Sequence, residues 1–106
     1  MVKIKTLEVL QKEVDKHILN SKTGYFSPLS ALARLIEEVG ELAREINHYC
    51  GDKRKKCYEA AGSISEELGD IFFTVVCLCN IFKVDLEESF NKIMLKYKTR
   101  DKDRFN

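Results

Sequence analysis

The chain has 106 residues, of which 44% are apolar and 33% are charged, and its formal net charge is +1. This length suits one domain over residues 1–106, the apolar content excludes an intrinsically disordered chain, and the near-neutral charge argues against a polycation that binds nucleic-acid polymers. The longest apolar run, residues 71–79, is about half as long as a membrane-spanning helix. Charges interrupt residues 1–14 too often for a signal peptide, so we expect a cytoplasmic protein without a membrane partner.

Helical periodicity dominates the chain and predicts four helices in succession. The first covers roughly residues 4–19, where apolar residues recur at every third or fourth position. The second is predicted over residues 28–49, because Ser27 suits an N-cap, Pro28 suits the first helical position and Gly51 suits the residue after a helix.

A capping box predicts where the third helix begins. After a polar, basic connection over residues 51–62, Ser63 and Glu66 match this pattern, which predicts a helix over residues 64–82. None of the four cysteines in the chain forms a C-x-x-C pair, so a structural zinc site is not expected.

The fourth helix is predicted to begin after Asp85, its N-cap, and to end near residue 97, with Glu88 completing a second capping box. Residues 98–106 are charged and have no apolar period, so they are predicted as a charged tail. With no β-like alternation anywhere, these segments predict an all-α fold.

Three glutamates share one face of the second predicted helix. Glu37, Glu38 and Glu41 lie three or four residues apart, which places them in one sector. The apolar residues of this helix lie largely on another side: Leu32, Leu35, Val39, Leu42 and Ile46. Taken alone, this pattern is typical of the solvent-facing side of an amphipathic helix.

The third helix changes this interpretation. Glu67 and Asp70 are one turn apart, and the segment that follows Asp70 is apolar all round, which indicates burial. No Lys or Arg occurs in residues 57–82, and an isolated buried charge is very costly. A Mg²⁺ or Mn²⁺ ion shared with the second helix would neutralise these carboxylates. We expect Glu66, in contrast, to cap the helix or to lie in an outer shell.

A di-iron site is an alternative interpretation of the acidic helices. Glu45 and His48 form one E-x-x-H pair, but a ferritin-like site needs two such pairs. The other histidine, His17, has no Glu three residues before it, so this reading is set aside.

The two acidic motifs together resemble the MazG-like group of all-α NTP pyrophosphatases. The group's pattern is E-E-x-x-E, a spacer of 25 residues and E-x-x-D, which reads here Glu37-Glu38-x-x-Glu41 and Glu67-x-x-Asp70. The segments "GYFSPLSALARLIEEVGELAREINH", "EELGDIFF" and "LEESFNKIMLKYKTRDKDRF" also look like short single-domain members from bacteria and viruses. The resemblance covers the chain from about residue 20 onward.

This resemblance implies a MazG-like four-helix bundle that is completed by oligomerisation, as a homodimer or homotetramer. It implies Mg²⁺-dependent hydrolysis of a (d)NTP to (d)NMP and pyrophosphate, with Mn²⁺ as an alternative ion. The metal ligands would be Glu38, Glu41, Glu67 and Asp70. Glu37 would be a further ligand or the base that orients a metal-activated water for attack at the α phosphate. Glu38, beside it, would be both a metal ligand and a catalytic residue.

Basic residues recur through the fourth helix and the tail. Residues 92–106 contain six basic and two acidic side chains. We predict that Lys96, Arg100 and Lys102 contact the phosphates, Arg bidentately and Lys as point charges. The alternative is a solvated basic tail.

A nucleobase needs a flat apolar surface, and Tyr25 and Phe26 offer one just before the acidic helix. The alternative for Phe26 is that it fixes the helix start to the core. Asn80 interrupts an apolar run and needs a specific partner, which is either the base or sugar or a buried group on another helix.

The sequence therefore predicts a nucleoside triphosphate pyrophosphohydrolase, and it leaves the biological role open among nucleotide-pool sanitation, a stress response and a viral need. A phosphoribosyl-ATP pyrophosphohydrolase-like enzyme is the near alternative, because it shares the metal motif. A non-catalytic helical protein with an acidic face for a basic partner is the alternative from another class. The preferred nucleotide is left open.

Overall fold

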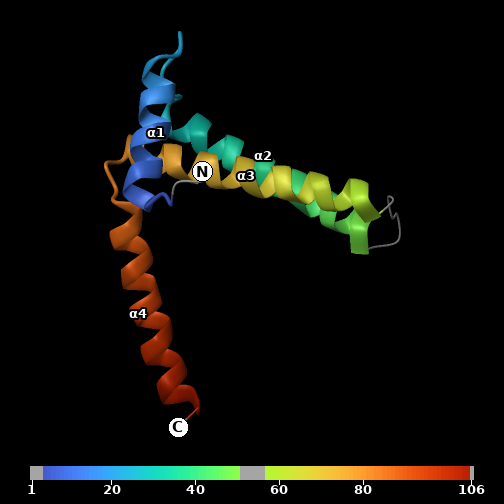
Figure 1. The fold of residues 1–106 in the computed structure, drawn as a ribbon, viewed down its shortest axis with the longest axis vertical. Coiled ribbons are helices and arrows are strands. Elements are labelled where there is room, and N and C mark those ends of the chain that lie inside the picture. The colour runs from blue at the N-terminus through green and yellow to red at the C-terminus, as the bar shows by residue number, and fades with distance from the viewer. Residues whose placement is uncertain (1–3, 51–56, 106) are drawn as a thin grey trace.

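The computed structural model describes the backbone of residues 4–50 and 57–105, and the side chains of residues 4–50 and 63–101. Every regular element within these ranges is a helix, which confirms the all-α class (Figure 1). The four helices are α1 (Leu7–Leu19), α2 (Pro28–Cys50), α3 (Cys57–Ile81) and α4 (Leu86–Phe105).

The long helices α2 and α3 lie side by side as an antiparallel hairpin, and α1 packs across α3 near the start of α4 (Figure 1). α4 then projects away from the hairpin. The radius of gyration is 17.0 Å, whereas a compact domain of this length has about 13 Å. The chain is therefore an open arrangement of helices.

Side-chain caps fix three of the helix starts. The Thr6 hydroxyl accepts a hydrogen bond from the Val9 amide at 3.1 Å and begins α1 three residues later than the periodicity indicated. The predicted caps of α2 and α4 are confirmed: the Ser30 amide donates to the Ser27 hydroxyl at 3.2 Å, and the Glu88 amide donates to Asp85 at 3.1 Å. Each cap satisfies an amide that has no partner inside its helix.

Two predicted helix ends were wrong. α3 begins at Cys57 rather than near Ile64, so the residues interpreted as its capping box lie inside the helix. Only Gly62 opposes a helix between these positions, and one glycine is tolerated. α4 continues to Phe105 rather than ending near Tyr97, because its charged segment has no Gly or Pro and a helix does not need an apolar stripe to continue. Residues 51–56 of the predicted connection lie outside the described residues.

The apolar part of α3 supplies much of the small core. Val76 is fully buried. Thr74 is also buried, and its hydroxyl donates to the main-chain oxygen of Asp70 at 2.9 Å. Across the part of the chain that the structure describes, no helix is both long and apolar enough to cross a membrane.

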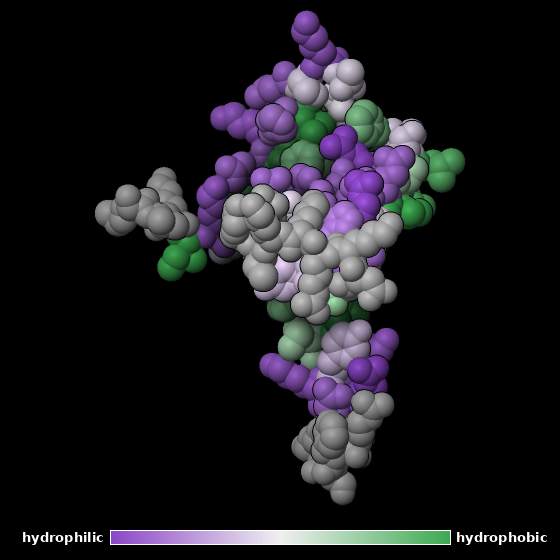
Figure 2. Space-filling model, turned by 90° about the vertical axis from the view of Figure 1, so that its right-hand side faces the viewer, coloured by the Kyte–Doolittle hydropathy of each residue, from purple (hydrophilic) through white to green (hydrophobic). Residues whose placement is uncertain are grey.

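A large part of the apolar surface stays uncovered. The accessible surface is 8537 Å², against about 6,100 Å² for a compact protein of this mass. The stripe on α2 that was predicted to face the core is half-exposed at Leu32 (44%), and Leu68 and Phe72 of α3 are exposed to similar degrees. Figure 2 shows such apolar patches among the charged side chains of one face.

We expect Val76→Ala to lower the free energy of unfolding by about 2 kcal/mol, because it removes two buried methyl groups and leaves a cavity. Val9→Ala removes the same atoms from an exposed position of α1 and should change stability by less than about 0.5 kcal/mol. Urea denaturation followed by circular dichroism measures both, and equal losses would contradict the assignment of Val76 to the core.

Candidate active site

Three carboxylates converge between α2 and α3. One carboxylate oxygen from each of Glu38, Glu67 and Asp70 lies within 4.8 Å of the others. Glu67 and Asp70 are one turn apart on α3, and the antiparallel α2 brings Glu38 opposite them. No other group of three potential metal ligands occurs within the described residues. We refer to these three residues as the acidic cluster.

The electrostatics of the acidic cluster fit a divalent cation. Burial is the main cause that raises the pKa of Glu67, followed by a hydrogen bond to Glu38 and by the nearby carboxylates of Glu38, Asp70 and Glu41. Glu67 Oε2 is buried and has no hydrogen-bond partner. A cation would replace the proton that Glu67 tends to hold and would give this oxygen a partner. A donor set made only of carboxylate oxygens suits a hard ion such as Mg²⁺ or Mn²⁺.

The other two predicted glutamates lie around the acidic cluster rather than in it. Glu41 is close enough to raise the pKa of Glu67, but its carboxylate forms an ion pair with Arg44. Glu37 is exposed and lines an open groove together with Arg34 and Glu38. The structure thus brings together three of the four predicted metal ligands and places Glu41 beside them.

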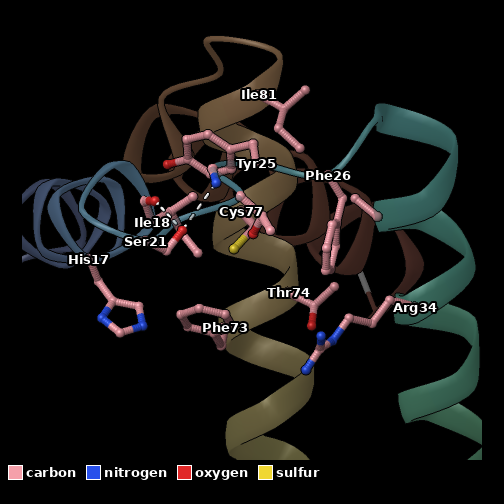
Figure 3. A pocket seen from close by; sticks show the side chains of 13 residues that line it. His17, Ile18, Ser21, Tyr25, Phe26, Arg34, Phe73, Thr74, Cys77 and Ile81 are labelled. Carbon is pink, nitrogen blue, oxygen red and sulfur yellow. Dashed lines mark hydrogen bonds between the residues drawn. The ribbon is translucent and has the colours of Figure 1, made fainter.

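A cavity of about 220 Å³ lies between α1, the loop that follows it, α2 and α3 (Figure 3). Its walls are mainly apolar and aromatic, and they include Ile18, Phe26, Ala31, Phe73 and Ile81. Thr74 also lines the cavity and is one turn beyond Asp70, so α3 leads from the acidic cluster into the cavity.

Tyr25 and Phe26 both line this cavity. The Tyr25 hydroxyl donates to Asp15 at 2.6 Å, and burial together with this hydrogen bond raises the pKa of Tyr25 to about 12. The hydroxyl therefore stays neutral and engaged, and the ring is what Tyr25 presents to the cavity. Phe26 is 49% exposed, and its ring lies 6.0 Å from the guanidinium carbon of Arg34.

Asn80 does not line the cavity, and its amide is fully occupied by neighbouring groups. Its Nδ2 donates to the main-chain oxygen of Gln11 and to the Tyr25 hydroxyl, both at 3.0 Å. Its Oδ1 accepts from Gln11 Nε2 at 3.0 Å. The structure therefore places Asn80 in a hydrogen bond between helices, one of the two alternatives that the sequence left open.

The predicted phosphate-binding residues lie on α4, away from the acidic cluster (Figure 1). Arg100 lies over the Tyr97 ring at 4.6 Å, and Lys96 is exposed beside it. The side chain of Lys102 lies outside the described residues. Within one chain, the described side chains of α4 do not meet the carboxylates.

Sequence reasoning missed residues that the structure brings to the cavity. His17 reaches it from α1 and packs edge-on against Phe73, with ring centroids 6.4 Å apart. Arg34, which the sequence analysis did not single out, lines the cavity and pairs loosely with Glu38. Its position four residues before Glu38 was the one signal that could have found it.

Comparisons with known proteins identify the family. The MazG nucleotide pyrophosphohydrolase domain matches residues 26–105. The chain belongs to this family. It is therefore a hydrolase that acts on the pyrophosphate bonds of nucleotides, which excludes the purely non-catalytic alternative.

Individual relatives agree with this assignment. The MazG-family chain is 52% identical over 101 residues to the uncharacterized protein YpjD of Bacillus subtilis (strain 168), covering 95% of this chain and 91% of YpjD. The crystal structure of a Bacillus-conserved MazG protein, a nucleotide pyrophosphohydrolase, superposes with a TM-score of 0.80 at 50% identity, covering 96% and 99% of the two chains. The crystal structure of YpjD from Bacillus subtilis superposes with a TM-score of 0.81 at 49% identity, covering 91% and 98%.

The raised pKa of Glu67 predicts how the stability of the metal-free protein depends on pH. A pKa that is higher in the folded state means that the stability from protonated Glu67 is present at low pH and is lost as pH rises through the folded pKa. We expect Glu67→Gln, which mimics the protonated group, to lose less thermal stability than the wild type as the pH rises above the ordinary pKa of a glutamate.

Thermal melts with EDTA at several pH values provide this measurement, and Glu66→Gln on the same helix serves as the control. Parallel pH profiles for the wild type and Glu67→Gln would contradict the prediction.

Proposed function

We propose that this MazG-family chain hydrolyses nucleoside triphosphates to nucleoside monophosphates and pyrophosphate. The convergence of Glu38, Glu67 and Asp70 within 4.8 Å is the observation that carries the proposal. Mg²⁺ is the proposed ion, with Mn²⁺ as an alternative, and Glu41 is the proposed fourth ligand. When bound, such an ion neutralises phosphate charge and lowers the pKa of water.

The protein residues around the ion would position and deprotonate the nucleophile. Glu38 and Asp70 come from two rigid helices, which supports a fixed position for the ion and for the α phosphate beside it. We assign to Glu37, exposed next to Glu38, the acceptance of a proton from the attacking water. A bond forms between the water oxygen and the α phosphorus, the bond to the bridging oxygen breaks, and pyrophosphate leaves.

The cavity is the proposed site for the nucleobase. It adjoins the acidic cluster through Thr74 and Asp70, and aromatic rings from Tyr25 and Phe26 line it. Aromatic stacking accepts any base, so this proposal leaves the preferred nucleotide open. Asn80 would act indirectly, by holding the Tyr25 hydroxyl.

We infer that a second copy of the chain covers the exposed face of the hairpin. Apolar side chains recur on α2 with the three- and four-residue spacing of a coiled-coil seam, and all of them are exposed: Leu29, Leu32, Ile36, Val39 and Ile46. A homodimer would bury this seam, and a homotetramer is the alternative. The same assembly would let Lys96, Arg100 and Lys102 of one copy reach phosphates bound to the other, which fits their distance from their own acidic cluster.

Removing one carboxylate should abolish both metal binding and hydrolysis. We expect Asp70→Asn to lower kcat with Mg²⁺ by about a hundredfold or more, because it leaves the ion without one of its charged ligands. Pyrophosphate release from a panel of canonical and modified (d)NTPs and from phosphoribosyl-ATP provides the assay. Glu87→Gln, at an exposed position in the first turn of α4, is the matched control.

Wild-type rates for Asp70→Asn would sink the proposed metal site. Hydrolysis of phosphoribosyl-ATP alone would assign the chain to the alternative activity.

A charge in the seam should disrupt assembly. We expect Ile36→Glu to shift the protein towards monomers and to lower activity at least about tenfold, because the buried seam would hold an unpaired carboxylate. Light scattering coupled to size-exclusion chromatography measures the mass, and Lys12→Glu on the exposed side of α1 is the control. An unchanged mass for Ile36→Glu would show that this face is not the interface.

A further inference from the structure

Arg34 connects the cavity to the acidic cluster. It extends from α2 towards Thr74 of α3, and its guanidinium lines the cavity (Figure 3). Its Nε lies 3.9 Å from Glu38 Oε1, and its Cζ lies 6.0 Å from the centre of the Phe26 ring. The guanidinium of Arg34 therefore lies between the proposed base site and a proposed metal ligand.

The guanidinium is held loosely by these contacts. A separation of 3.9 Å is longer than a hydrogen bond, and half of the Arg34 side chain is exposed. Among the described residues, the Arg34 side chain donates no hydrogen bond, so its five N–H donors are available for a ligand. Arg44 differs, because it forms a short hydrogen bond with Glu41 and does not line the cavity.

We propose that Arg34 binds the α-phosphate of the nucleotide, as a substrate-binding residue supplied by the same chain as the acidic cluster. This inference rests on the proposed function. A base in the cavity and phosphates at the carboxylates place the α-phosphate between them, where Arg34 lies. Guanidinium groups bind phosphate oxygens through two parallel hydrogen bonds, which gives both charge and orientation.

In this proposal Arg34 has two successive partners, first the carboxylate of Glu38 and then the α-phosphate of the nucleotide. Without a cation, Arg34 partly compensates the negative charge that Glu38 brings close to Glu67 and Asp70. With a cation held by Glu38, the attraction of this carboxylate for the guanidinium would be weaker, and Arg34 would be free to bind the phosphate. The negative charge that develops on the α-phosphate oxygens during attack would then have a fixed positive partner.

Inhibition by the product monophosphate, compared with inhibition by its nucleoside, separates phosphate binding from base binding. The inhibition constants of a nucleoside and of its 5′-monophosphate are measured with Mg²⁺ and the best (d)NTP of the panel. We expect Arg34→Ala to weaken inhibition by the monophosphate about 10- to 100-fold and to leave inhibition by the nucleoside unchanged. Arg34→Lys should recover part of the loss, because it restores the charge but not the two parallel hydrogen bonds.

Arg44→Ala is the matched control, because it removes the same charge from the same helix. Arg44, like Arg34, is paired with a glutamate of the acidic motif. We expect it to leave the preference for the monophosphate over the nucleoside within about twofold of the wild type. Equal losses of monophosphate inhibition in the two variants would show a general charge effect and overturn the proposal. So would an equal weakening of nucleoside and monophosphate by Arg34→Ala, which would place Arg34 in the base site alone.

The activity of Asp70→Asn shows whether a negative result refutes the role of Arg34 or the proposed function. An inactive Asp70→Asn enzyme combined with wild-type monophosphate inhibition in Arg34→Ala would refute the role of Arg34 and leave the proposed function intact. A fully active Asp70→Asn enzyme would refute the proposed function itself. Circular dichroism and thermal melts of each variant confirm that the fold is retained.

Discussion

The packing of α2 against α3 forces the carboxylates of Glu38, Glu67 and Asp70 together against their mutual repulsion. Apolar contacts in the hairpin hold this arrangement, because the helices cannot separate the charges without exposing residues such as Val76. Burial first, and then the neighbouring carboxylates, raise the pKa of Glu67. A site on two rigid helices holds its ligands in place before any ion arrives, which favours fast and selective binding.

A single glutamine determines how the remaining helices are placed around this hairpin. Gln11 of α1 donates to Asn80 of α3 and to the main-chain oxygen of Val84, and it accepts from the amide of Leu86 at the start of α4. Asn80 in turn holds Tyr25 at the cavity wall. The direction of α4 and the position of an aromatic wall thus depend on one connected set of hydrogen bonds, whose members must all be satisfied together.

The sequence predicted what depends on local spacing. Helical periodicity places Glu67 and Asp70 on one face, and the caps Ser27 and Asp85 mark helix starts through contacts within one turn. Arg34 escaped notice because its place at the cavity depends on Phe26, from a loop, and on α3, whereas the spacing within α2 shows only its pairing with Glu38. The direction of α4 was equally hidden, since it is set by a side chain 75 residues earlier. The stripe on α2 was detected, but its periodicity does not say whether this chain or another one covers it.

The cavity wall that α1 provides lies outside the domain that defines the family, which begins at residue 26. His17 and Ile18 reach the cavity from this N-terminal helix, whereas the carboxylates belong to the shared domain. Evolution can therefore alter this wall without disturbing the helices that carry the chemistry. With the nucleobase in this cavity, as proposed, differences in substrate choice among relatives should map to α1 before they map to the acidic motif.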